Sequence, residues 1–191
     1  MSWRSEVFDR PRVQVLRDPA WLLAPLYVRD LLGLAVPAGP AQPGPLVPAV
    51  EHRPVPAGAP EDAAARWPGW WQAAVAHRPD VGAPRDRDLA AAAGLATLWE
   101  LLAADVRGWL DARRAARSDP AAGVEQDLLQ RWASATGRAP APRTLTVQTV
   151  PVAGPLLVRA DTDRWVVATG LRERPADYRH LLEPVLAELF G

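Results

Sequence analysis

The chain is organised around residues 86–117, which read DRDLAAAAGLATLWELLAADVRGWLDARRAAR. Large apolar side chains recur there at intervals of one, three or four positions, so they fall on one face of an α-helix. Asp86 or Asp88 can cap the first turn. Gly94 and Gly108 each cost about 1 kcal/mol relative to alanine, so we expect another element to pack closely there. The pattern predicts one long central helix whose apolar face consists of Leu95, Leu98, Trp99, Leu102, Val106, Trp109 and Leu110.

The composition is that of a globular protein without a charge bias. Of the 191 residues, 49% are hydrophobic and 23% are charged, so the chain can bury a sizeable core. The 22 basic and 22 acidic residues cancel, which argues against a nucleic-acid partner. Every basic residue is arginine, and together with the many alanines and prolines this bias is typical of a GC-rich bacterial genome.

Cysteine content and hydropathy limit the chemistry and the location that we expect for this protein. The chain has no cysteine, which excludes disulfides, thiolate catalysis and cysteine metal ligands. Residues 1–10 lack the apolar run of a signal peptide. The most apolar window, residues 21–36, contains Pro25, Arg29 and Asp30 and is too broken to span a bilayer. We therefore expect a soluble cytoplasmic protein that has no membrane partner.

The N-terminal third contains a predicted strand and helix followed by a proline-rich segment. Residues 12–16 alternate apolar and polar side chains, which predicts a strand. Asp18 and Pro19 then resemble the N-cap and first position of a helix that ends near Gly33. Eight prolines between positions 37 and 60 exclude a regular helix or central strand. This segment is either a flexible linker or an ordered strap, and the apolar residues within it slightly favour the strap.

The chain beyond the central helix predicts a helix, a small sheet and a final helix. Asp119–Pro120 would begin a helix that Gly137 ends. Residues 144–150, 156–160 and 165–169 have strand-like patterns, and their short connections favour antiparallel pairing. The predicted fold class is therefore α+β. Helices surround a long central helix, and a C-terminal three-stranded antiparallel meander is covered by the final helix.

We expect three consecutive parts within one compact domain. Residues 1–36 contain the first strand and helix, residues 37–60 the strap or linker, and residues 61–191 the α+β core. Within the core, Trp67-Pro68-Gly69 is expected to divide residues 61–77 into two short helical pieces, because proline interrupts a helix.

The sequence contains no familiar catalytic or metal-binding motif. His52, His77 and His180 are far apart, and no two of them have the i, i+4 spacing of a zinc site. There is no G-x-S-x-G elbow and no glycine motif for phosphate, and without lysine a P-loop is excluded. We therefore expect no metal and no cofactor. A non-catalytic protein is favoured, although an enzyme built from scattered residues stays open.

Asp105 lies between two apolar sides of the predicted central helix. A buried carboxylate without a partner is too costly to keep. We therefore expect Asp105 to be partly buried and paired with an arginine, a tyrosine hydroxyl or an indole N–H. An ion pair at the rim of the helix is favoured over a catalytic acid.

Trp67, Trp70 and Trp71 crowd a short segment beside the prolines. Either the prolines cover these indoles, or at least one indole stays exposed as a binding surface, and we expect the exposed indole. The favoured function is non-catalytic binding of a protein partner or a second copy of the chain, through these tryptophans or a sheet edge. The alternative is a small-molecule binder or enzyme with a pocket between the sheet and the central helix. Exposed indoles would favour the first hypothesis and a deep cavity the second.

Overall fold

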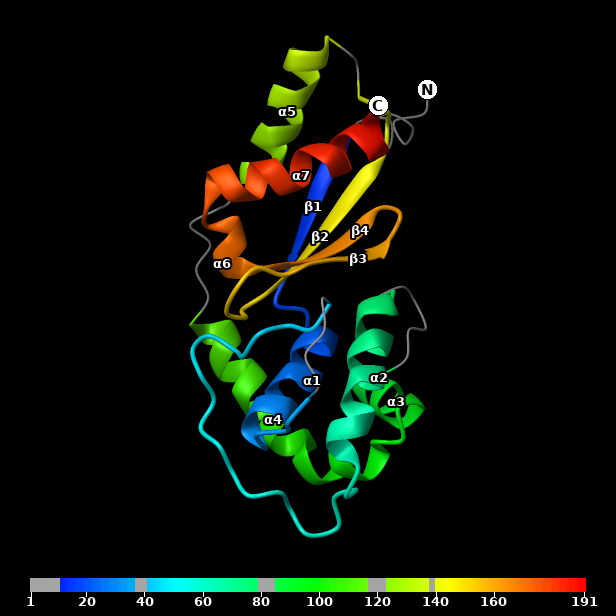
Figure 1. The fold of residues 1–191 in the computed structure, drawn as a ribbon, viewed down its shortest axis with the longest axis vertical. Coiled ribbons are helices and arrows are strands. Elements are labelled where there is room, and N and C mark those ends of the chain that lie inside the picture. Colours follow the sequence, from blue (N-terminus) through cyan, green and yellow to red (C-terminus); the bar gives the residue numbers. More distant parts are fainter. Residues whose placement is uncertain (1–10, 37–40, 79–84, 117–122, 138–139) are drawn as a thin grey trace, which may run out of the picture.

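The protein combines a four-stranded sheet with helices, which confirms the α+β class (Figure 1). The computed structural model describes residues 11–36, 41–78, 85–116, 123–137 and 140–191. The strands are β1 Arg12–Arg17, β2 Thr144–Val150, β3 Leu157–Asp161 and β4 Arg164–Ala168. The helices are α1 Ala20–Leu31, α2 Ala63–Ala76, α3 Asp86–Ala92, α4 Ala96–Ala115, α5 Val124–Thr136, α6 Thr169–Arg172 and α7 Pro175–Phe190. None of the helices in these ranges is both long and apolar enough to cross a membrane.

The strand order in the sheet is β1-β2-β4-β3, which differs from the predicted meander. β1 pairs parallel with β2, β2 pairs parallel with β4, and β3 is antiparallel to β4. The expectation of a three-stranded antiparallel meander was therefore wrong. The connection after β2 carries the chain past the position of β4, and a tight turn at residues 162–163 brings it back. Alternating side chains predict strands, but they do not say which strands are neighbours.

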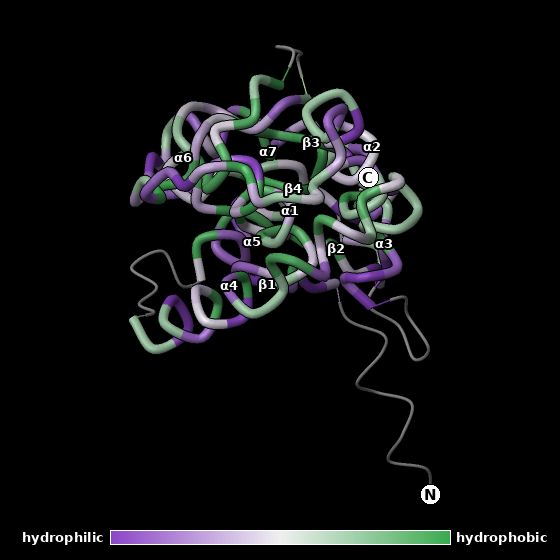
Figure 2. The backbone as a smooth tube through the Cα atoms, turned by 90° about the horizontal axis from the view of Figure 1, so that it is seen from below, coloured by the Kyte–Doolittle hydropathy of each residue, from purple (hydrophilic) through white to green (hydrophobic). Residues whose placement is uncertain are grey.

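The elements gather into two lobes (Figure 1). Helices α1 to α4 form what we call the helical lobe, and the sheet with α5, α6 and α7 forms the sheet lobe. α7 passes across the sheet near the start of β1 and β2. The buried apolar side chains of the two lobes form one continuous core. Figure 2 shows hydrophobic stretches such as α1 and β4 near the middle of the molecule, with hydrophilic stretches toward the rim.

The predicted central helix is divided into α3 and α4 at Gly94. This residue has a φ of +73°, a left-handed conformation that favours glycine and ends a helix. Arg66 packs against Gly94 and donates to its carbonyl at 3.1 Å. At Gly108 we expected another element to pack closely, and this expectation was wrong. Apart from its chain neighbours and the backbone of its own helix, no described atom lies within 4 Å of the position that a Cβ would take. The apolar face of α4 was predicted correctly, because its buried residues are Leu98, Trp99, Leu102, Val106 and Leu110.

α2 is one continuous helix, although Pro68 predicted a break. The proline has no N–H and leaves one helical hydrogen bond unmade. In a continuous helix, however, Trp67, Trp70 and Trp71 follow the spacing of one face, and α2 packs on α1 and α3. Burying three indoles on one face outweighs the cost of one proline. α7 likewise continues past Pro184.

The proline-rich segment crosses the surface as an ordered strap, defined here as residues 41–60 (Figure 1). Arg29 of α1 lies in its path and donates to the carbonyl oxygens of Pro43 and Gly44 at 2.6 and 2.7 Å. Asp30, the next residue, accepts a hydrogen bond from Arg29 Nε at 2.6 Å. Residues 37–40, the beginning of the predicted segment, lie outside the described residues.

The strap also contacts the sheet lobe. Asp30 accepts the N–H of Leu46 at 2.6 Å, and Leu46 forms an antiparallel bridge with Val152, in the loop after β2. The N–H of Val47 bonds the carbonyl of Pro151 at 2.7 Å. Leu46 is 2% exposed, so the bridge also buries an apolar side chain. The strap therefore joins α1 to the loop that follows β2.

We expect Leu102→Ala to lower the free energy of unfolding by about 2–5 kcal/mol, because Leu102 is buried in the core and its loss leaves a cavity. Leu101→Ala is the matched control, because Leu101 precedes it on the same helix and is 43% exposed. The control should change stability by about 0.5 kcal/mol or less. Urea denaturation measures both values, and equal midpoints would show that the faces of α4 are wrongly assigned.

We expect Arg29→Met to loosen the strap, because the variant removes the donors that hold Pro43 and Gly44. A hydrogen bond from a charged group contributes about 1.5–3 kcal/mol, so thermolysin should cut residues 41–60 at least about tenfold faster. Arg107→Met is the control, because Arg107 is exposed on α4 and donates to the Ala103 carbonyl of its own helix. Cleavage at the same rate in both variants would contradict the role of Arg29.

Candidate functional site

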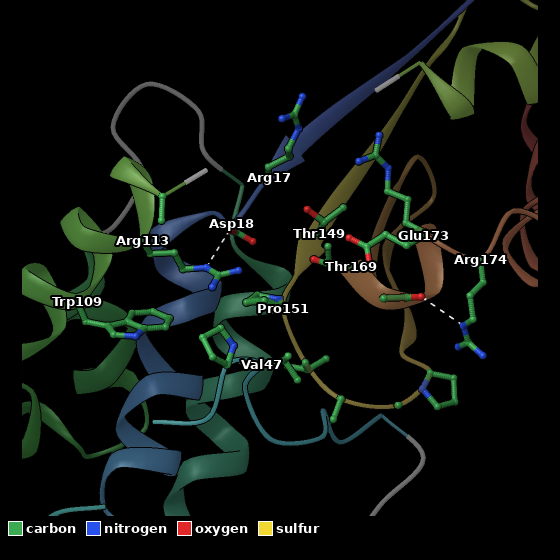
Figure 3. A pocket seen from close by; sticks show the side chains of 18 of the residues that line it. Arg17, Asp18, Val47, Trp109, Arg113, Thr149, Pro151, Thr169, Glu173 and Arg174 are labelled. Atoms are coloured by element: carbon green, nitrogen blue, oxygen red, sulfur yellow. Dashed lines mark hydrogen bonds and ion pairs between the residues drawn. The ribbon is translucent and has the colours of Figure 1, made fainter. Parts of the chain in front are cut away.

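A cavity of about 920 Å³ lies between the lobes, at the carboxyl ends of the three parallel strands (Figure 3). We call it the carboxyl-edge pocket. β1 contributes Arg17 and the following Asp18, β2 contributes Thr149, and Thr169 follows β4. The opposite wall is the C-terminal half of α4. Ligands of sheets with parallel strands commonly bind outside the carboxyl ends of the strands, so this is the first place to seek a site.

Asp18 joins β1 to α1 and has an uncommon backbone conformation. Its φ of +48° is the only positive value at a non-glycine position among the described residues. Its N–H bonds the Thr149 carbonyl at 3.0 Å, which extends the pairing of β1 with β2. Its carboxylate accepts Arg113 Nε at 2.9 Å and does not cap α1, contrary to the sequence prediction. Left-handed non-glycine residues are costly, and they cluster at functional sites.

Arg113 of α4 presents an oriented cation to the carboxyl-edge pocket (Figure 3). Asp18 holds one edge of its guanidinium, whose central carbon lies 5.8 Å from the ring centroid of Trp109. The side chains of Arg113 and Asp18 are 21% and 16% exposed, so the pair is largely shielded from water. The bond to Asp18 uses Nε, and the guanidinium has further N–H donors suited to a carboxylate or phosphate.

The lining of the pocket combines charged, hydroxyl and apolar groups. Arginines outnumber carboxylates among its charged residues, which are Arg17, Asp18, Arg113, Arg172, Glu173 and Arg174. The apolar lining includes Val47, Pro48, Trp109, Pro151, Val152 and Pro155. Thr169 Oγ1 is buried and has no hydrogen-bond partner within the described residues. This combination suits a molecule that has an anionic group and an apolar body.

A buried ionic network fixes α6 beneath the pocket. Arg172 is paired through two nitrogens with Glu125 of α5, and its Nη2 donates to Oε2 at 2.9 Å. The hydroxyl of Tyr178, in α7, donates to Glu125 Oε1 at 2.9 Å. These side chains are almost fully buried. Burial first, and then the charge of Glu125, raise the pKa of the Tyr178 phenol well above its ordinary value, so it stays a donor.

The structure places Trp67, Trp70 and Trp71 inside the core, with exposures of 0%, 0% and 3%. The expectation that at least one of these indoles stays exposed was therefore wrong, because the unbroken α2 turns all three inward. Trp67 Nε1 donates to the Pro25 carbonyl at 2.6 Å, and Trp71 Nε1 donates to the Ala41 carbonyl of the strap at 3.1 Å. These tryptophans offer no exposed aromatic surface.

Asp105 is half-buried and has a charged partner, as the sequence predicted. Arg53 Nη1 donates to Asp105 Oδ1 at 2.8 Å, and the Asp105 side chain is 36% exposed. The pair joins α4 to the strap. After burial, the charge of Asp105 is the main cause of a raised pKa at Tyr27. Asp105 does not line the carboxyl-edge pocket.

The three histidines lie in separate places. His52 is in the strap beside Gly33, His77 follows α2 with its ring edge-on to Trp21, and His180 is in α7. No group of three His, Cys, Asp or Glu residues in the described part of the chain could hold a metal ion. The chain matches no family model, no curated protein and no solved structure.

The residues of the carboxyl-edge pocket were not recognised from the sequence. The pattern Asp18–Pro19 predicts a helix cap, and Arg113 is one of several arginines near the end of α4. A weak signal existed, because β1, β2 and β4 each end next to a polar side chain: Arg17, Thr149 and Thr169. Those ends meet only because the strands are parallel, and the sequence predicted antiparallel pairing.

We expect Tyr178→Phe to lower the free energy of unfolding at pH 7 by about 1–3 kcal/mol, because it removes a buried donor to Glu125. The folded pKa of Tyr178 lies above its ordinary value of 10.0, so its contribution is present below pH 10 and is lost as the pH rises further. The variant should therefore lose less stability than wild type above pH 10. Parallel losses, measured by denaturation at each pH, would contradict this role.

Proposed function

We propose that the protein binds a small organic anion in the carboxyl-edge pocket. The observation that carries the proposal is the guanidinium of Arg113, held by Asp18 and Trp109 on the pocket wall. An oriented, partly buried arginine recognises carboxylate or phosphate more strongly than a mobile surface cation does. The apolar lining, including the exposed Val47, would contact the remainder of the ligand.

The burial of the tryptophans and the presence of this cavity favour small-molecule binding over binding through an aromatic surface. The cavity lies between the sheet and α4, where the alternative hypothesis places a pocket. Binding of a protein partner through a sheet edge stays a prediction. The edge strands are β1 and β3.

The proposal is limited to binding, without turnover, because four of the six charged residues that line the pocket are held in ion pairs. Asp18 is paired with Arg113, Arg172 with Glu125, and Arg174 with Asp177. These pairs fix the shape and charge of a receptor site.

Titration calorimetry with hexanoate tests the proposal, since hexanoate joins a carboxylate to an apolar chain. We expect hexanoate to bind, and Arg113→Ala to weaken binding at least about tenfold by removing a charge-assisted hydrogen bond. Arg114→Ala is the matched control, because Arg114 is the next residue on α4 and its side chain is 62% exposed. The control should bind hexanoate as wild type does.

Asp18→Asn tests the charge argument without removing the arginine. Asparagine tolerates a positive φ, so the backbone should keep its conformation. Loss of the competing carboxylate should strengthen binding of hexanoate. Equal affinity in wild type, Arg113→Ala and Asp18→Asn would contradict the proposal, and so would an absence of binding to wild type. Native mass spectrometry of protein from its own host can then identify the natural ligand.

A further inference from the structure

A second cavity, of about 480 Å³, lies on the face of the sheet that meets the helical lobe. We call it the Gln148 pocket. Its floor is formed by β1, β2 and β4, and Trp21 at the start of α1 forms part of its wall. Arg164 of β4 spans the junction of the lobes, because its Nη2 donates to the Ala76 carbonyl at the end of α2 at 3.0 Å. Its lining residues differ from those of the carboxyl-edge pocket.

The floor is polar in a place where a covered sheet face is usually apolar. The register aligns Gln14, Thr146 and Arg164 across three strands, and Gln148 lies in the next row of the same face. The opposite face of β2 carries Leu145 and Val147, both fully buried. The polar residues are therefore concentrated on one face, at adjoining positions around one cavity.

Gln148 is the most unusual residue of this floor. It is 0% exposed, and neither its amide nitrogen nor its amide oxygen has a hydrogen-bond partner in the described residues. The indole Nε1 of Trp21, which lines the same cavity, is also buried without a partner there. Buried polar groups in native proteins are nearly always hydrogen-bonded, because an unsatisfied group loses its bonds to water. Gln148 and Trp21 both line this cavity, and their unpartnered polar atoms are an amide donor, an amide acceptor and an indole donor.

We propose that the Gln148 pocket binds a small neutral molecule through a carboxamide or imide edge. The Gln148 amide offers a donor beside an acceptor, so its complement is an acceptor beside a donor. The indole N–H of Trp21 supplies a second donor to a ligand carbonyl. A neutral ligand fits the charges nearby, because Arg78 at the pocket is paired with Asp161, and Arg164 and Asp163, of opposite charge, both line the cavity.

Nitrogen-15 NMR of the full chain tests this proposal, with uracil and acetamide as probes and acetate as the charged comparison. The side-chain amide signal of Gln148 is identified by its absence in Gln148→Leu, and the indole signal of Trp21 by its absence in Trp21→Phe. We expect both signals to shift and saturate with uracil or acetamide but not with acetate. Gln148→Leu should weaken binding at least about tenfold.

The unliganded variants give a second readout that does not depend on the probes. Gln148→Leu replaces an unsatisfied amide with an apolar side chain of similar size, so its melting temperature should rise. Gln72→Leu makes the same change at an exposed position of α2 and should leave the melting temperature and probe binding unchanged. The proposal is overturned if neither neutral probe shifts the two signals, if acetate alone shifts them, or if Gln148→Leu melts at a lower temperature than wild type.

Discussion

The hydrogen bonds from α1 to the strap are the interaction on which the rest of the structure depends. A segment so rich in proline has few N–H groups and no regular ladder, so it cannot order itself. Arg29 and Asp30 supply what it lacks, a donor for its carbonyls and an acceptor for the Leu46 N–H. The ordered strap then reaches the loop after β2, and Val47 and Pro48 become part of the carboxyl-edge pocket. Two adjacent charged residues thus order a strap, join two lobes and complete a cavity.

β2 is the wall that the two candidate pockets share. Consecutive side chains of a strand point to opposite faces. Gln148 therefore faces the cavity against α1, while Thr149 faces the cavity against α4. A displacement of β2 along its own axis would change the shape of both pockets. A ligand that fixes the position of β2 in one pocket would therefore change the affinity of the other pocket for its ligand.

Local patterns predicted much of the secondary structure but little of the candidate site. The buried face of α4, the end of α5 at Gly137 and the turn after β3 follow from periodicity and from residues that terminate an element. The burial of the tryptophans does not follow from the local pattern, because Pro68 predicts a break in α2, whereas the packing of a whole helix face keeps the helix continuous. The site depends on strand order, and on the left-handed conformation of Asp18, which long-range contacts impose.

The parallel pairing of β1 with β2 has a consequence for how the chain is made. β1 is synthesised before the other described strands, but β2, its partner in the sheet, follows after the whole helical lobe and α5. Until then, β1 is an unpaired strand, and closing so long a loop is entropically costly. Earlier folding of α1 to α4, whose contacts are closer in sequence, would shorten the effective loop. A helical lobe that folds early would hold β1, which directly precedes α1, in place for its pairing with β2.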